Sequence, residues 1–316
     1  MNTTQSLFEG VIVMFAIISL SIFLKKISVL KKEDTAIFSK LVLQVTLPAV
    51  IFSSLALKTF NQEYLVMAML MAVVEIAIMI LAWFTATLLK FKRGEKGALI
   101  LVSAFGMTTM LGYPLIRQVF PGNVIAMQEA VITSEFGVGL LLFIMGPLIA
   151  MYYGDSGVKG KVIFQSMKRF FTSPIFISLI LGILISLLPV DKSGQIFTTF
   201  FRVFKLIGHA NLFLVALVIG LLIEVKQFKN IYLFMGIAVL LKLIVKPILA
   251  IWFSEAIEIT EMMKEIVFIE TALPSAILTA VFAKQYNCRP DLVSMAVMIT
   301  LVLSLASVSL LFIVFI

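Results

Sequence analysis

The sequence is poor in charged residues, and this lack excludes most soluble folds. Only 13% of the 316 residues are charged, whereas 61% are hydrophobic and the mean hydropathy is +1.14. A typical soluble domain carries roughly 25% charged residues and about 45–50% apolar residues. Because a chain of this composition cannot hide its apolar surface from water, we expect a protein that is embedded in a lipid bilayer.

Cysteine and histidine are each present only once, as Cys288 and His209. Counting alone therefore excludes a disulfide within the chain and a metal cluster built on cysteines. The sequence also lacks a Walker-type phosphate loop, a Gly-x-Ser-x-Gly elbow and a His-rich metal spacing. These absences argue against a primary pump and against the commoner membrane enzymes, so we expect neither enzyme activity nor a cofactor or metal.

The formal net charge of +8 does not indicate a nucleic-acid partner, because of where the basic residues lie. They gather in alternate loops between apolar runs, with sixteen Lys and Arg on one side and six on the other. Cytoplasmic loops carry the excess of Lys and Arg in membrane proteins. We therefore predict a multi-pass protein of the plasma (inner) membrane with both termini outside, and no nucleic-acid binding.

Ten apolar runs bounded by charge, Gly or Pro predict ten membrane-spanning helices, each near the roughly 20 residues that a bilayer requires. They are Leu7–Leu24, Ala36–Leu57, Tyr64–Leu89, Gly97–Ile116, Ala126–Tyr153, Pro174–Leu188, Leu206–Ile223, Ile231–Phe253, Ile266–Phe282 and Leu292–Ile316. The aromatic and basic segment Gly194–Lys205 is typical of a helix at the membrane interface, either separate from the seventh span or joined to it.

The order of the runs predicts two five-helix halves, with residues 1–153 and 174–316 joined by a cytoplasmic loop of residues 154–173. Five is an odd number of crossings, so a second half that resembles the first must enter the membrane from the opposite side. This arrangement is the inverted repeat of many secondary transporters. The predicted fold class is thus an all-α polytopic membrane protein built from two inverted repeats.

The fourth and ninth spans each contain a proline, Pro114 and Pro274, in matching places of the two halves. Proline lacks an amide hydrogen and crowds the preceding turn, so both spans are expected to open locally. Half-helices that start near these prolines would aim their positive dipole ends and freed amides at a carboxylate. Pro48 and Pro247 are read instead as simple kinks.

These breaks predict a set of substrate-binding residues around the two prolines. They are Thr108, Thr109, Gly112, Tyr113, Pro114, Thr271, Pro274 and Ser275.

Several motifs resemble the auxin efflux carrier family, in particular its bacterial-type members. They are Leu47 to Phe52, Leu111 to Leu115, Gly208 to Gly220, and the stretch from Leu273 through Ala283-Lys284-Gln285-Tyr286 to Asp291 and Ser304. The resemblance implies a ten-helix fold of the bile acid/sodium symporter-like superfamily, in which spans four and nine cross and a transport subdomain moves against a scaffold. It also implies a small organic anion as substrate and suggests a homodimer.

The sequence departs from the family at one place that matters for specificity. Where the family commonly has an Asn seven residues before the span-four proline, this chain has Met107, and Thr109 replaces a Gly. A side-chain amide is therefore missing, although the hydroxyls of Thr108 and Thr109 can donate hydrogen bonds. We therefore do not assign the substrate of any relative to this chain.

Five ionisable residues are the candidates for a functional role at membrane depth, where each requires a partner, a cavity or a changed protonation state. They are Glu75, Glu135, Glu270, Lys242 and Lys246. Glu270 precedes the span-nine break, where burial and the helix dipole both oppose ionisation, so it either binds a proton or organises the crossing. Glu135 either faces the same cavity or pairs with one of the two lysines, and His209 is a packing residue or a proton relay.

The sequence as a whole predicts a secondary transporter that moves a small organic anion by alternating access, with coupling to H+ or Na+ left open. One alternative is a sodium-coupled organic-anion symporter of the bile-acid type. Another is a membrane receptor that binds the same ligand without moving it, because binding and transport share the same static chemistry.

Overall fold

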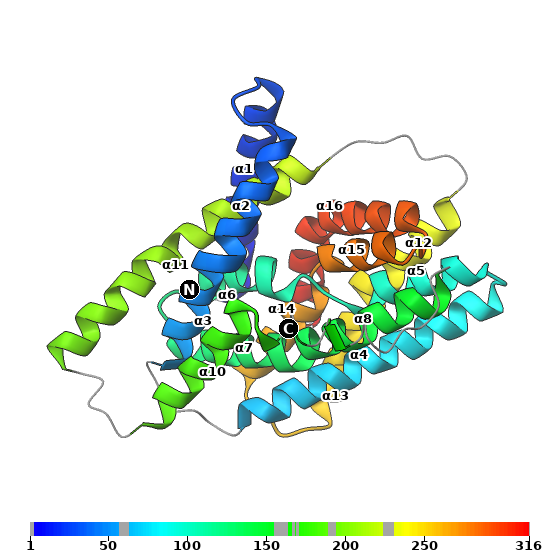
Figure 1. The fold of residues 1–316 in the computed structure, drawn as a ribbon. Coiled ribbons are helices and arrows are strands. Elements are labelled where there is room, and N and C mark those ends of the chain that lie inside the picture. Colours follow the sequence, from blue (N-terminus) through cyan, green and yellow to red (C-terminus); the bar gives the residue numbers. More distant parts are fainter. Residues whose placement is uncertain are drawn as a thin grey trace. The chain divides into compact units, whose positions relative to one another are not determined.

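The structure is a computed structural model that describes residues 3–56, 63–154, 164–165, 168, 171–188, 194–223 and 231–315. Within these ranges the regular elements are all helices, apart from one isolated bridge between Gly106 and Ser275 (Figure 1). Seven helices are long and apolar enough to cross a membrane. The prediction of an all-α, multi-span membrane protein is therefore confirmed, whereas the ten-span inverted repeat stays a prediction.

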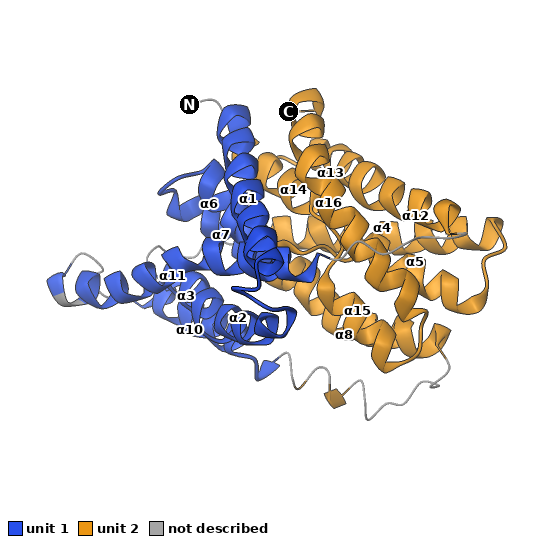
Figure 2. Ribbon diagram, turned by 90° about the horizontal axis from the view of Figure 1, so that it is seen from above, with its two compact units in different colours: residues 1–62, 109–131, 171–225 blue, residues 63–108, 132–170, 226–316 orange. Residues whose placement is uncertain are grey.

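The chain divides into two compact units, coloured blue and orange in Figure 2. Unit 1 contains residues 1–62, 109–131 and 171–225, and unit 2 contains residues 63–108, 132–170 and 226–316. Each unit thus combines segments of both predicted halves. The predicted division at residues 153 and 174 is a statement about symmetry and stays a prediction, and most of its connecting loop lies outside the described residues.

Unit 1 is formed by helices from all three of its sequence ranges. They are α1 (Thr3–Lys26), η1 (Lys32–Asp34), α2 (Thr35–Leu41), η2 (Val42–Thr46), α3 (Leu47–Ala56), α6 (Tyr113–Val119), α7 (Val124–Ile132), α10 (Pro174–Leu187) and α11 (Gln195–Leu222). The segment Gly194–Lys205 that was left open in the sequence belongs to the long helix α11 and is continuous with the seventh span.

Helices α1 and α11 of unit 1 pack in backbone contact. A Cβ on Gly220 would lie 2.5 Å from the Cβ of Ser21, so only glycine permits this approach. The Ser21 hydroxyl donates to the Leu217 carbonyl at 2.8 Å, and the Lys25 ammonium donates to the carbonyls of Leu221 and Ile223 at the end of α11. A cation at a helix C-terminus interacts favourably with the helix dipole, so Lys25 stabilises this end.

Unit 2 contains the remaining elements. They are α4 (Glu63–Leu88), α5 (Arg93–Ala104), η4 (Thr133–Gly139), α8 (Leu140–Tyr153), α12 (Tyr232–Val239), η5 (Leu240–Val245), α13 (Lys246–Glu255), α14 (Glu261–Ala272), α15 (Ile277–Gln285) and α16 (Pro290–Phe315). Helix α4 packs against α5 and η4, and a large apolar cluster joins these helices to α8, α12 and α16. The described part of the unit is thus a helical bundle with an apolar core.

Three prolines each lie two positions after the last residue of a π-helical segment. Segment η2 precedes Pro48, η3 (Thr108–Gly112) precedes Pro114, and η5 precedes Pro247. A π turn is wider than an α turn, so it absorbs the clash between the proline ring and the carbonyl of the preceding turn. The helices therefore continue through these prolines, as was expected for Pro48 and Pro247 but not for Pro114.

Candidate functional site

Two helices of unit 2 end abruptly and their chains then cross. Helix α5 ends at Ala104 and α14 ends at Ala272, and the next residues, Phe105 and Leu273, are extended with ψ of 126° and 156°. The Met107 amide donates to the Pro274 carbonyl and the Ala276 amide donates to the Phe105 carbonyl, both at 2.9 Å. The two segments that were predicted to cross thus do meet, whereas their place as the fourth and ninth of ten spans stays a prediction.

The expectation that this crossing leaves its backbone amides open for a ligand is wrong for three residues. Met107 and Ala276 bond across the crossing, and the Ser275 amide donates to the Thr300 hydroxyl at 3.2 Å. An unpaired amide away from water is costly, so antiparallel pairing of the two unwound segments is the arrangement that satisfies both. The amides of these residues are therefore occupied and cannot by themselves form an anion site.

The position of the break in the fourth span also differs from the expectation. Pro114 lies in the first turn of α6, which follows η3 without interruption, so no half-helix starts at this proline. The extended residues are Phe105 to Met107, several residues earlier in the chain. In the ninth span the break does lie at Pro274, and the next helix begins at Ile277.

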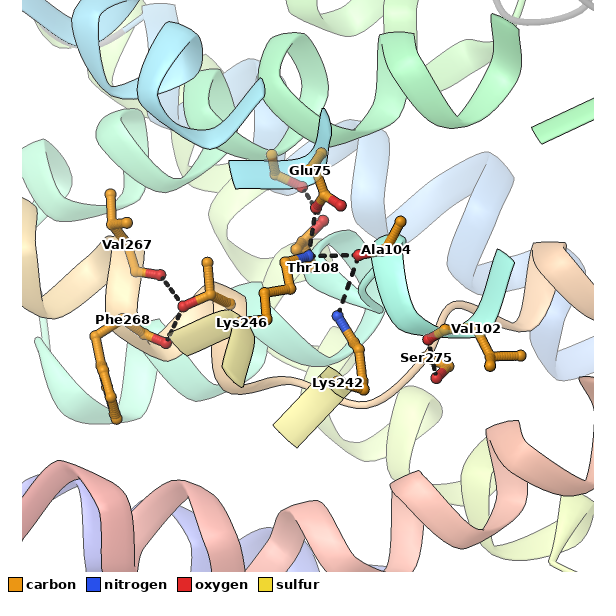
Figure 3. Close-up of polar contacts among 11 residues, drawn as sticks. Glu75, Val102, Ala104, Thr108, Lys242, Lys246, Val267, Phe268 and Ser275 are labelled. Atoms are coloured by element: carbon orange, nitrogen blue, oxygen red, sulfur yellow. Dashed lines mark hydrogen bonds and ion pairs between the residues drawn. The ribbon is translucent and has the colours of Figure 1, made fainter. Parts of the chain in front are cut away.

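The hydroxyl groups near the crossing are engaged in local hydrogen bonds (Figure 3). The Ser275 hydroxyl donates to the Val102 carbonyl at 2.6 Å, and the Thr271 hydroxyl lies within 2.9 Å of the carbonyls of Val267 and Phe268. The Ser134 hydroxyl donates to Thr108 at 2.5 Å. The hydroxyls of Ser275 and Thr271 thus donate to backbone carbonyls and stabilise the ends of α5 and α14.

Two buried lysines lie beside the carbonyl end of α5 (Figure 3). The Lys246 ammonium contacts the Glu75 carboxylate and the Ala104 carbonyl, each at 2.5 Å. The Lys242 ammonium reaches the same carbonyl at 3.4 Å, and it has no ion-pair partner among the described residues. Lys242, Lys246 and Glu75 are all fully buried.

Gly106 places the crossing directly against one of these lysines. A Cβ at this position would lie 3.1 Å from the Lys242 ammonium, 3.4 Å from Thr108 and 3.5 Å from the Glu270 carbonyl. A larger residue would therefore have to displace at least one of these groups. The unwound segment approaches Lys242 this closely because residue 106 has no side chain.

Two acidic residues complete the set of buried charged residues that the structure describes in unit 2. Glu270 lies in the last turn of α14 and is fully buried, and neither carboxylate oxygen has a hydrogen-bond partner in the part of the chain that the structure describes. Glu135 lies in η4 and is also buried, and Glu135, Lys246 and Glu75 are the charged groups that act on Glu270. Lys246 pairs with Glu75, and the predicted alternative that Glu135 pairs with one of the two lysines stays a prediction.

The remaining predicted site residues belong to unit 1. Thr109 and Gly112 lie in η3, whereas Tyr113, Pro114 and His209 line a cavity of about 450 Å³. The sequence analysis missed the part that Arg117 plays in lining this cavity, although its position one turn after Pro114 was a usable signal. It also missed that both lysines donate to the Ala104 carbonyl, because a backbone acceptor cannot be recognised from the type of residue.

A multi-span helical protein with two unwound, crossing segments beside buried charges is typical of membrane transporters. The chain belongs to the membrane transport protein family, which is the auxin efflux carrier family that the sequence resembles, and the family model matches residues 6–154 and 159–312. The match covers nearly the whole chain. The protein is therefore a membrane transport protein.

Two relatives are similar along nearly their full length. An uncharacterized transporter of Methanocaldococcus jannaschii is 26% identical over 306 residues, which are 96% of each chain. An uncharacterized transporter of Methanothermobacter thermautotrophicus is 23% identical over 309 residues, again 96% of each chain. Neither name states a substrate.

Proposed function

We propose that the protein is a secondary transporter that carries a small organic anion by alternating access and binds its carboxylate at the crossing in unit 2. The observation that carries the proposal is Lys242, a fully buried lysine beside Gly106 with one long hydrogen bond of 3.4 Å. A buried charge is expensive unless it is paired, so such a residue in a membrane protein indicates a functional site. A carboxylate of the substrate is the missing partner.

The neighbouring Lys246 does not compete for this role. Its ammonium is neutralised by Glu75 at 2.5 Å and also contacts the Ala104 carbonyl. It therefore holds α4, α5 and α13 together, and Lys242 is the cation left for a ligand. Because the crossing amides are occupied, the proposal rests on this charge and on Thr108, and not on freed backbone groups.

The predicted substrate-binding residues have different roles in the proposed site. Thr271, Pro274 and Ser275 shape the crossing through their own backbone contacts, and Thr108 lies next to Gly106 and Lys242. Thr109, Gly112, Tyr113 and Pro114 continue the same broken span into unit 1. Met107 is buried, so the change from the family Asn removes an amide from the interior of the crossing segment and favours a substrate other than that of Asn-containing relatives.

We further propose that Glu270 carries the coupling proton. A buried carboxylate without a hydrogen-bond donor is costly to keep charged, and the nearby Glu135 adds repulsion when both are ionised. In Glu270→Gln the uptake rate should lose its dependence on an imposed pH gradient. An unchanged response to that gradient would remove the proton role and leave Glu270 as an organiser of the crossing.

The experiment that tests the proposed function is uptake of labelled dicarboxylates by the purified protein in proteoliposomes. Parallel arms impose a proton gradient, a sodium gradient or neither. Saturable uptake that responds to the proton gradient supports the proposal, whereas uptake that requires sodium would support the symporter alternative. Specific binding without any flux would favour the receptor and contradict transport.

A further inference from the structure

The cavity in unit 1 is lined by basic and polar side chains that have no role in the transport site proposed at the crossing in unit 2. It has a volume of about 450 Å³ and is lined by α3, α6, α7, α11 and the connection from α6 to α7. Arg117 and Lys205 bring two cations to it from two different helices, and His209 and Asn211 add polar groups. Among the described residues that line it, none is acidic. The cavity is therefore electropositive.

The polar groups of the cavity retain free donors. Arg117 uses one nitrogen to donate to the Gly208 carbonyl at 2.9 Å, out of the five N–H groups that a guanidinium offers. Asn211 is 2% exposed and accepts from the Thr46 hydroxyl at 2.7 Å, while its amide nitrogen makes no hydrogen bond within the described ranges. Lys205 is exposed and likewise has no partner in the described structure. These groups can all turn to a ligand.

The wall of the cavity is held in place by its own turn chemistry. Gly122 adopts a φ of 74°, which lets the chain reverse between α6 and α7. The next residue, Asn123, accepts hydrogen bonds from the amides of Ile125 and Ala126 at 3.0 and 3.1 Å and so caps α7. This short, capped connection fixes the backbone on one side of the cavity.

We infer that this cavity is a second anion site and that it binds a small dicarboxylate. A guanidinium fork suits one carboxylate through paired hydrogen bonds, and a lysine ammonium suits the other as a point charge. The volume lies within the range of about 300–1,000 Å³ that small-molecule sites occupy. The inference goes beyond the proposed function, because binding in unit 1 requires neither flux nor the crossing.

Isothermal titration with succinate tests the inference on the full chain in discs of neutral lipid. The titration uses the Lys242→Met background, in which the proposed substrate site has lost its cation. We expect residual succinate binding that weakens about fivefold in Lys205→Gln, since an exposed ion pair contributes up to about 1 kcal/mol. Arg202→Gln is the matched control, because Arg202 is an exposed cation on the same helix and does not line the cavity.

Further arms define the ligand class. Acetate should bind more weakly than succinate, because it can engage only one of the two cations, and added salt should weaken both. Arg117→Gln should weaken succinate binding by about tenfold through loss of a charge-assisted hydrogen bond. Because Arg117 also contacts Gly208, Lys205→Gln keeps the test valid if that variant folds poorly.

The outcomes separate this inference from the proposed function. Residual succinate binding that Lys205→Gln weakens supports the second site, even if the protein shows no flux in liposomes. Absence of residual binding, or equal binding in Lys205→Gln and Arg202→Gln, overturns it and leaves the transport proposal standing. Tighter binding of phosphate or of phosphatidylglycerol than of succinate also overturns it, since the site would then serve a phosphate group.

Discussion

Gly106 lies where the two unwound segments pair, and the space around it is filled. The nearest groups to a new Cβ are the Lys242 ammonium, Thr108 and the Glu270 carbonyl, all within 3.5 Å. Lys242 and Thr108 are also the residues to which the transport proposal assigns the substrate, whereas it assigns the proton to the Glu270 carboxylate and not to this backbone carbonyl. The packing at Gly106 therefore controls the position of the proposed substrate groups.

Gly106→Ala should lower the rate of succinate uptake by about ten- to a hundredfold, because a small displacement of positioned groups has effects of that size. The measurement is initial uptake in proteoliposomes. Gly236→Ala is the matched control, since a Cβ at Gly236 meets nothing within 4 Å. Equal rates in the two variants would show that Lys242 does not need its present position.

Lys246 and Glu75 form the buried ion pair of the same cluster, and their role is structural. Lys246→Met leaves the Glu75 carboxylate unpaired and should destabilise the protein by about 3–5 kcal/mol. A thermal-unfolding series in detergent measures the effect. Combining it with Glu75→Met should restore most of the stability, and a double variant as unstable as the single one would contradict the pairing.

Single residues of the site were only partly predictable from the sequence. Charged residues at membrane depth are rare enough to be recognised, so all five members of the cluster were identified. Their pairing was not, because helical spacing does not say which faces meet. Lys246 pairs with Glu75 from α4, and that contact spans 171 positions of the chain.

The Ser275 hydroxyl helps to end helix α5 at the crossing, because it binds a carbonyl of the last turn. It donates to the Val102 carbonyl at 2.6 Å, which is one of the last carbonyls of α5 without a helical partner. Thr300 of α16 in turn contacts both the amide and the hydroxyl of Ser275. Ser275 therefore connects the segment after α14 to both α5 and α16.

Ser275→Ala should lower the stability of the protein by about 1–3 kcal/mol, the cost of a buried acceptor that loses its donor. Ser309→Ala is the control, because the Ser309 hydroxyl is buried in α16 of the same unit without a hydrogen-bond partner in the described chain. The measurement is thermal unfolding of both variants in detergent. A Ser309→Ala variant that loses more stability than Ser275→Ala would contradict the assigned contacts.

At the level of elements, long apolar runs predicted the observed helices reliably, whereas prolines predicted the interruptions of helices less reliably. The first, third and tenth spans coincide closely with α1, α4 and α16, since each is a continuous apolar helix. Pro114 was misread because a proline breaks a helix only if the turn before it cannot widen. The π turn of η3 does widen, and the actual break falls at Phe105, which carries no sequence signal of its own.

The predicted orientation of the whole molecule rests on charge counting and is open to a direct test. Both Gln5 and Lys32 are exposed, and the only cysteine, Cys288, is buried. In intact cells a membrane-impermeant maleimide should label Gln5→Cys and spare Lys32→Cys, both in a Cys288→Ala background. Labelling of Lys32→Cys alone would place the N-terminus in the cytoplasm and reverse the topology.

Composition and loop charge establish the class of the molecule without any structure, because bilayer thickness fixes span length and few soluble chains are this apolar. The division into units was beyond reach of the sequence. Residues 109–131 belong to unit 1 although they continue helices of unit 2, and no break in composition marks either boundary. Substrate identity is also beyond reach, since one buried cation accepts any carboxylate.

The central claim is that Lys242 is kept for the substrate and not for the fold, and the uptake rate of Lys242→Met measures this directly. Removing a buried cation that has one 3.4 Å hydrogen bond should leave the thermal stability equal or higher, in contrast to Lys246→Met. Succinate uptake should fall at least about tenfold, since truncating one partner of a buried charge pair costs about 2–5 kcal/mol of binding. A stable Lys242→Met variant that transports at the wild-type rate would contradict the account.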